Sequence, residues 1–72
     1  MNIRAETYLV IRRGGEYLVG KIMGGPELKW STSPWDAWKT RNREDAEDVA
    51  RATVGDIWLF NQVAGQVREA KL

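Results

Sequence analysis

The longest periodic segment of the chain lies between residues 43 and 54. Small or apolar residues recur there three and four positions apart, and the positions between them are mostly charged. This period places the recurring residues on one face of an amphipathic helix. They are Ala46, Val49, Ala50, Thr53 and Val54. Asn42 is a good N-cap, and the Asp45 side chain could return a hydrogen bond to it as in a capping box. We therefore predict one main helix over about residues 43–54.

The helix is followed by a glycine and an apolar strand. Gly55 is predicted to end the helix in the left-handed conformation, because it lacks the Cβ that disfavours that region. Residues 57–60 are all apolar, without the alternation of a strand that has one solvated face. Such a run is typical of a strand covered on both faces of its sheet.

The first half of the chain predicts three strands. Residues 7–11, 16–23 and 28–31 are rich in β-branched, aromatic or alternating residues. Gly14-Gly15 supplies a hairpin turn between the first two, and Gly20 marks a bulge or a close approach. In the third strand Leu28 and Trp30 share one face.

Shorter elements are predicted on either side of the helix. Ser33-Pro34 has the pattern of an N-cap followed by proline at the first helical position, which predicts a single helical turn. Trp35 and Trp38, three residues apart, would lie on one side of that turn. Residues 66–70 are predicted to return as an edge strand.

These elements define an α+β fold: a small antiparallel sheet of three to five strands with one main helix on one face. Its 72 residues form a single domain, 1–72. Residues 8–11 and 57–60 carry apolar side chains toward both faces, yet one helix covers only one face. The second face must be covered by the segment from Trp30 to Trp38, by another copy in a homodimer, or by a partner. We expect Trp30, Trp38 and Trp58 to be core and Trp35 to be partly exposed.

Charge is unevenly distributed along the chain. The net charge is only +1, but residues 1–43 hold eight Lys or Arg and four Asp or Glu, whereas residues 44–56 hold one Arg and five acids. The helix is therefore an acidic element on a mildly basic body. The small net charge argues against strong nonspecific polyanion binding. No signal or membrane-spanning pattern occurs, so a cytoplasmic location is expected and no membrane partner.

The residue types argue against catalysis. The chain has no histidine and no cysteine, so the commonest general base, thiol nucleophile and metal ligands are missing. The one dense carboxylate cluster, within residues 44–48, lies opposite the apolar stripe in the first turns of the helix, where capping and solvation account for it. The glycine pairs lack phosphate-loop spacing. We expect no enzyme, no cofactor and no metal.

Nucleic-acid binding is the alternative function. Arg12 and Arg13 at a hairpin tip, with basic residues elsewhere and tryptophans between them, could form a basic surface with stacking platforms for single strands. No zinc finger, helix-turn-helix or ribonucleoprotein motif accompanies them.

The chain also resembles small phage and prophage proteins of unknown function, which share its order of short motifs. The motifs are Tyr8-Leu9-Val10-Ile11, a glycine hairpin, Tyr17-Leu18, Trp30-Ser31, Ala37-Trp38, Glu44 to Ala46, Val49-Ala50, Gly55 and Ile57. The resemblance covers most of residues 7–60. Trp38 stands where a phenylalanine is common, and Trp35 and the C-terminal extension are additions. The resemblance implies a bacterial cytoplasm and no specific site residues.

The sequence therefore predicts a non-enzymatic interaction module that binds a host or phage protein, with self-association as a further expectation. An inhibitory, anti-defence role is one specific form of this hypothesis. The predicted contact surface combines the hairpin tip, one tryptophan and the acidic helix face. Its residues are Arg12, Arg13, Trp35, Glu44, Glu47 and Asp48.

Overall fold

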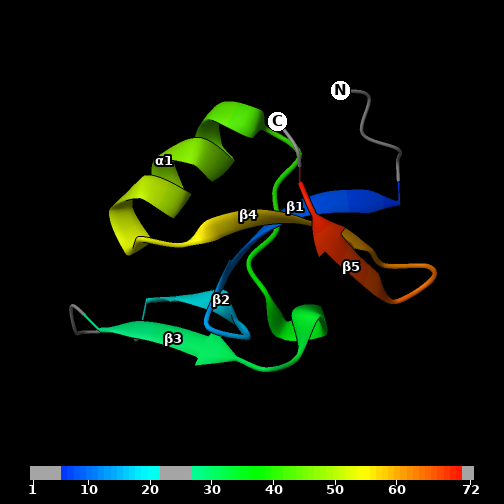
Figure 1. Cartoon of the computed structure of the whole chain (residues 1–72), viewed down its shortest axis with the longest axis horizontal. Coiled ribbons are helices and arrows are strands. Elements are labelled where there is room, and N and C mark those ends of the chain that lie inside the picture. The colour runs from blue at the N-terminus through cyan, green and yellow to red at the C-terminus, as the bar shows by residue number, and fades with distance from the viewer. Residues whose placement is uncertain (1–5, 22–26, 71–72) are drawn as a thin grey trace.

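The computed structural model describes residues 6–21 and 27–70, which form one antiparallel sheet with an α-helix on one of its faces. The order of the strands in the sheet is β3-β2-β1-β4-β5 (Figure 1). The elements in chain order are β1 (Thr7–Arg13), β2 (Glu16–Lys21), β3 (Leu28–Ser31), the 3-10 helix η1 (Pro34–Asp36), α1 (Arg43–Thr53), β4 (Asp56–Asn61) and β5 (Gln66–Glu69). The predicted α+β fold is confirmed. The predicted end of the second strand, at residues 22–23, lies outside the described residues.

The hairpin between β1 and β2 depends on its two glycines. Gly14 and Gly15 have φ angles of 58° and 85°, and Arg13 pairs with Glu16 directly across the turn. A two-residue hairpin turn with positive φ at both positions matches the right-handed twist of the strands, and glycine adopts it without steric cost. Farther along β2 the pairing with β3 shifts register between Leu18 and Gly20, as the predicted bulge requires.

The helix begins as predicted, with Asn42 as its N-cap, but the return bond of the capping box and the end of the helix differ from the prediction. Asn42 Oδ1 accepts a hydrogen bond from the Asp45 N–H at 3.2 Å. The Asn42 N–H donates to Thr40 Oγ1 at 3.0 Å, so a hydroxyl takes the place predicted for the Asp45 carboxylate. The left-handed residue at the helix end is Val54, with φ 55° and ψ 42°, and not Gly55. In the described part of the chain, no helix is both long and apolar enough to span a membrane.

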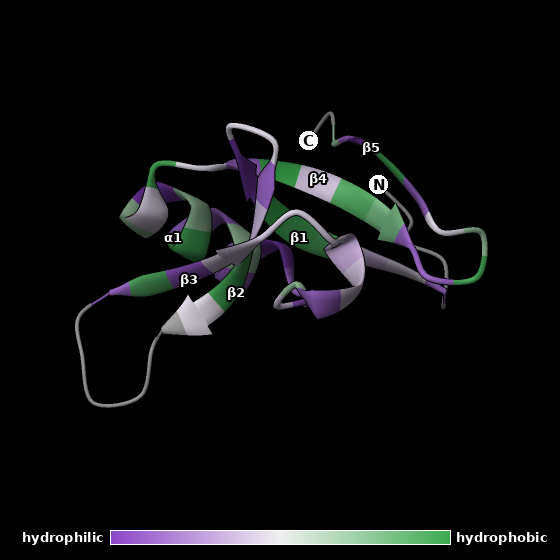
Figure 2. Cartoon of the chain, turned by 90° about the horizontal axis from the view of Figure 1, so that it is seen from below, coloured by the Kyte–Doolittle hydropathy of each residue, from purple (hydrophilic) through white to green (hydrophobic). Residues whose placement is uncertain are grey.

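The sheet has two apolar faces, which we call the helix face and the η1 face. Figure 2 shows hydrophobic (green) segments along the ribbons of β1 and β4. On the helix face, sheet side chains pack against Ala46 and Ala50 of α1; the buried ones are Leu9, Ile11, Leu18 and Leu59. On the η1 face the buried cluster consists of Val10, Tyr17, Ala37 and Phe60. Both β1 and β4 contribute to both clusters, which confirms that these strands are covered on their two faces.

The chain crosses from one face to the other through a gap in the sheet. β1 and β2 pair only next to their hairpin, at Arg12–Tyr17 and Arg13–Glu16. Beyond that point Leu9 exchanges backbone hydrogen bonds with Thr40, at 2.7 and 3.1 Å, and the Trp38 N–H donates to Leu18 O at 2.8 Å. The segment 38–40 therefore lies between β1 and β2 and satisfies backbone groups that the two strands would otherwise leave unpaired.

This crossing separates tryptophans that the sequence placed together. Trp38 packs against the helix-face cluster, as does Trp30, whereas Trp35 lies over Phe60 on the η1 face. The prediction that Trp35 and Trp38 share one side is wrong. Trp30, Trp38 and Trp58 are half-buried against the two clusters, and Trp35 is the exposed one, as expected.

Candidate functional site

Trp35 is the large aromatic side chain that the fold leaves most open to solvent among the described residues, with 55% of its surface exposed. It nevertheless has a defined position. Its indole meets the Phe60 ring edge-on, with the ring centroids 4.9 Å apart and the planes at 90°. The Trp35 backbone N–H donates to Ser33 Oγ at 3.3 Å, and the Trp35 backbone carbonyl accepts from Lys39 Nζ at 3.1 Å. These bonds hold the backbone of Trp35, and the contact with Phe60 positions the indole on the η1 face.

The turn between β4 and β5 lies beside this indole. A Cβ built on Gly65 would stand 3.5 Å from Trp35 Cζ2, so the indole packs next to the turn. The same turn carries Val63, which is 79% exposed, and β5 then places the half-buried Val67 opposite Phe60. We call Trp35, Val63 and Val67 the Trp35 surface. All three side chains are apolar, and tryptophan is enriched at the hot spots of protein interfaces.

The sequence did not predict Val63 or Val67 as contact residues. Val63 lies in a turn whose Asn61 and Gly65 indicate only a change of chain direction. The alternation in residues 66–69 does indicate that Val67 points to one face of an edge strand, but the pattern alone does not say that Trp35 lies on that face.

Cationic side chains lie over the other aromatic rings of the η1 face. The Arg12 guanidinium is 4.3 Å from the Trp58 ring centroid and 5.7 Å from that of Tyr17. Arg41 lies 4.5 Å from the centroid of Tyr8, a residue that β1 places on the same face as Val10. These distances are in the range of cation–π attraction. The rings of Trp58 and Tyr8 are therefore each faced by a cation.

The structure separates the two arginines of the hairpin tip. Arg12 stacks on the η1 face, whereas Arg13 points to the helix face, where its guanidinium is 4.3 Å from the Trp30 ring centroid. Arg13 Nη1 also donates to the carbonyl oxygen of Thr53 at 2.9 Å. That oxygen belongs to the last residue of α1, where a positive charge is favourable. Arg13 thus has a structural role at the helix end.

The predicted acidic residues lie on α1, which covers the helix face, away from Trp35. Glu47 accepts from Arg43 Nε at 2.7 Å, and Asp48 pairs with Arg51 on the solvent side of the helix. Glu44 is exposed in the first turn. The predicted contact residues thus fall into two groups: Trp35 and Arg12 on the η1 face, and Arg13 with the acids on the helix face.

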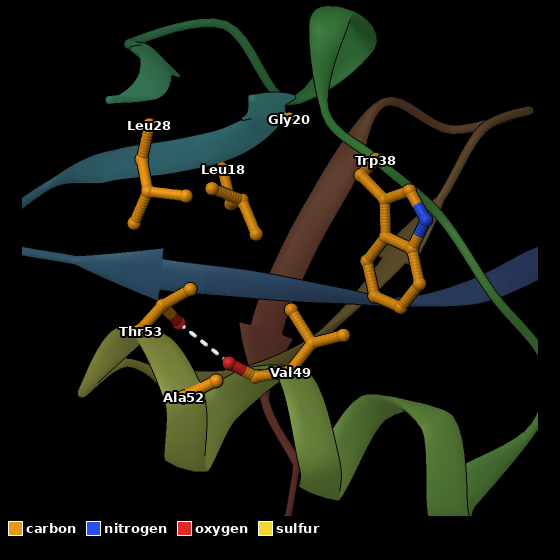
Figure 3. Close-up of a pocket in the computed structure, with 7 residues that line it drawn as sticks. All are labelled: Leu18, Gly20, Leu28, Trp38, Val49, Ala52 and Thr53. Carbon is orange, nitrogen blue, oxygen red and sulfur yellow. Dashed lines mark hydrogen bonds between the residues drawn. The ribbon is translucent and has the colours of Figure 1, made fainter. Parts of the chain in front are cut away.

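An apolar cleft of about 460 Å³ opens between α1 and the β2–β3 hairpin (Figure 3). The described residues that line it are Leu18, Gly20, Leu28, Trp38, Val49, Ala52 and Thr53. Thr53 carries the one side-chain hydroxyl of this set, and it donates to Val49 O at 2.7 Å. None of these lining side chains titrates. The described part of its lining therefore offers shape and apolar contact but no acid–base group.

Among the described residues no group of three or more carboxylates is placed to hold a metal ion. Comparison with known proteins adds no family: no protein-family model, no curated protein sequence and no solved structure matches the chain. The geometry of the described surfaces is therefore the basis on which a function can be proposed.

Proposed function

We propose that the chain is a non-enzymatic interaction module that binds a protein partner through the Trp35 surface. The observation that carries this proposal is an exposed tryptophan whose indole packs edge-on against Phe60 and whose backbone is hydrogen-bonded to Ser33 and Lys39. Tryptophan is enriched at interface hot spots, and a side chain already fixed in the free protein loses little rotamer entropy on binding.

The chemistry of the described surfaces supports a binding role over a catalytic one. Neither the Trp35 surface nor the described residues that line the apolar cleft contain a nucleophile paired with a base, and the sequence contains no histidine or cysteine. The resemblance to small phage and prophage proteins supports a partner from a bacterial host, and an anti-defence role would be one such case.

Binding to single-stranded nucleic acid is the second candidate, because Arg12, Lys39 and Arg41 lie over aromatic rings of the η1 face. The same contacts, however, make nucleic-acid binding a weaker candidate than protein binding. Arg12 faces the Trp58 ring on which a base would have to stack, and Lys39 Nζ donates to the carbonyls of Trp35 and Ala37. Both the rings and the Lys39 ammonium are thus engaged within the chain.

The test compares the chain with a Trp35→Ala variant as baits in nuclease-treated bacterial lysate, followed by affinity measurement with the purified partner. Truncation of a hot-spot residue costs 2 kcal/mol or more, so affinity should fall by about 30-fold or more. Val54→Ala is the matched control, because Val54 is 80% exposed but lies at the end of α1. A partner that binds the wild type and Trp35→Ala equally well would contradict the proposal.

The nucleic-acid candidate predicts a different result. Binding to a single-stranded oligonucleotide should be lost on nuclease treatment and should weaken steeply as salt rises, in proportion to the number of phosphates neutralised. Arg12→Met would then reduce the salt dependence. Salt-independent binding of a protein partner would leave no support for this candidate.

A further inference from the structure

The hydrogen bonds of β4 show which backbone groups of β5 point to the free edge of the sheet. The Gln62 N–H donates to Glu6 O at 3.0 Å, and this pair continues the register of β1 with β4. Because every second pair of an antiparallel ladder is hydrogen-bonded, the backbone groups of Phe60 and Trp58 also bond toward β1. The Ala70 N–H donates to Ile57 O at 3.3 Å in the register of β4 and β5. Hydrogen-bonded pairs alternate along an antiparallel ladder, so the next pairs are Leu59–Arg68 and Asn61–Gln66.

It follows that Val67 and Glu69 direct their N–H and C=O groups away from β4. No strand of the described residues lies beyond β5 (Figure 1). Such an edge is a template for one more antiparallel strand. The other edge strand, β3, pairs through a bulge, which twists an edge away from regular pairing. The register of β4 with β5 has no such irregularity.

The side chains of β5 set the charge that an added strand would meet. Val67 pairs with Phe60 on the η1 face, and Arg68 pairs with Leu59 on the helix face. Arg68 is exposed, and none of the acids among residues 6–21 and 27–70 pairs with it. An incoming strand thus meets Val67 and the exposed Glu69 carboxylate on the η1 face, and on the helix face the positive charge of Arg68, which is unpaired among the described residues.

This charge opposes pairing of β5 with the β5 of a second copy. Two β5 strands can pair around a two-fold axis normal to the sheet. The outward-pointing N–H and C=O groups of Val67 and Glu69 are then all hydrogen-bonded if Val67 of each strand bonds to Glu69 of the other. In that register the two Arg68 side chains are directly opposite each other, on the same face and in the closer, non-hydrogen-bonded kind of pair. Like charges in that position destabilise pairing, whereas an acid there stabilises it.

We propose that the β5 edge binds an extended antiparallel strand of a protein partner that has an acidic residue opposite Arg68. The inference rests on the proposed function and adds the conformation and charge of the partner segment. The added strand extends the sheet next to the Trp35 surface, so its side chain opposite Val67 lies on the face that carries Trp35.

The test uses an Arg68→Glu copy of this chain as the acidic strand. Analytical ultracentrifugation should find the wild type and the Arg68→Glu chain each monomeric, and their equimolar mixture should form a species of twice the monomer mass. With one chain isotope-labelled at a time, hydrogen exchange of the Val67 and Glu69 amides should slow in the mixture only. A mixture that stays monomeric, or a wild type that dimerises by itself with these amides protected, overturns the proposal.

Two controls separate this result from others. An Arg43→Glu copy changes the charge by the same amount on the solvent side of α1 and should not pair with the wild type. If it pairs equally well, general charge attraction explains the dimer and the proposal is wrong. A Trp35→Ala chain mixed with the Arg68→Glu chain should still dimerise, so failure of the edge and failure of the Trp35 surface are distinguishable.

Discussion

Gly55 lies against Ile11 so closely that a Cβ built on it would stand 2.6 Å from Ile11 Cγ2 and 3.4 Å from the Arg12 carbonyl oxygen. The glycine is therefore needed for the approach of the chain to β1 as it leaves α1, and not for a left-handed helix end. Ile11 is fully buried in the helix-face cluster, which leaves its side chain little room to move.

Gly55→Ala is expected to destabilise the fold by about 1–3 kcal/mol, the usual cost of inserting a methyl group into a packed core. Thermal unfolding should show it as a lower Tm, by about 4–8 °C for each kcal/mol in a domain of this size. Ile11→Ala removes Cγ2, so Gly55→Ala should cost less in that background than in the wild type. If the two substitutions lower the free energy of unfolding additively, the contact with Ile11 is not the cause of the destabilisation by Gly55→Ala.

Val54→Gly is expected to stabilise the fold. Val54 has φ 55°, a left-handed conformation that costs a residue with a Cβ about 1–2 kcal/mol. Glycine removes this cost but also makes the unfolded chain more flexible, which offsets part of the stabilisation. The free energy of unfolding should therefore rise by about 0.5–1 kcal/mol. Urea unfolding measures the difference. Val63→Gly is the control, since Val63 is equally exposed without a positive φ; if it stabilises as much, backbone strain at Val54 is not the cause.

The helix end illustrates what could be predicted from the sequence. The periodicity of residues 46–54 gave the helix to within one residue, because the 3.6-residue period is a local property of the chain. The left-handed residue was assigned to Gly55 because glycine adopts that conformation best. Only the three-dimensional structure shows that the position next to Ile11 needs a glycine, which leaves the left-handed conformation to Val54.

The position of the tryptophans illustrates what could not be predicted. Composition indicated that one tryptophan is exposed, and the helical turn at Ser33-Pro34 was evident from its cap. The face on which Trp35 or Trp38 lies depends on hydrogen bonds of Trp38 with Leu18 and of Thr40 with Leu9, residues more than 15 positions away. Local periodicity contains no information on such pairings, so the Trp35 surface could be predicted only in part.

Arg13→Ala is expected to destabilise the C-terminal end of α1. Its guanidinium donates to Thr53 O and stacks on Trp30, so its removal should cost about 1 kcal/mol. The Gly55 amide, which donates to Ala50 O at the helix end, should exchange faster with deuterium. Arg51→Ala is the control: it breaks an exposed pair with Asp48 and should change stability by about 0.5 kcal/mol or less. Equal effects would mean that Arg13 contributes only its surface charge.

Arg12→Met should leave the stability of the fold unchanged or raise it by up to about 1 kcal/mol. Among the described residues the buried Arg12 Nε has no hydrogen-bond partner, so the fold bears the cost of desolvating a donor. The linear methionine side chain can keep the contacts with Trp58 and Tyr17 without that donor. Arg12→Ala is the comparison, because it uncovers Trp58 and should destabilise by about 1–2 kcal/mol through lost packing. If methionine destabilises as much as alanine, the cation–π attraction of the guanidinium exceeds the cost of its buried Nε, and Arg12 is a structural residue of the η1 face.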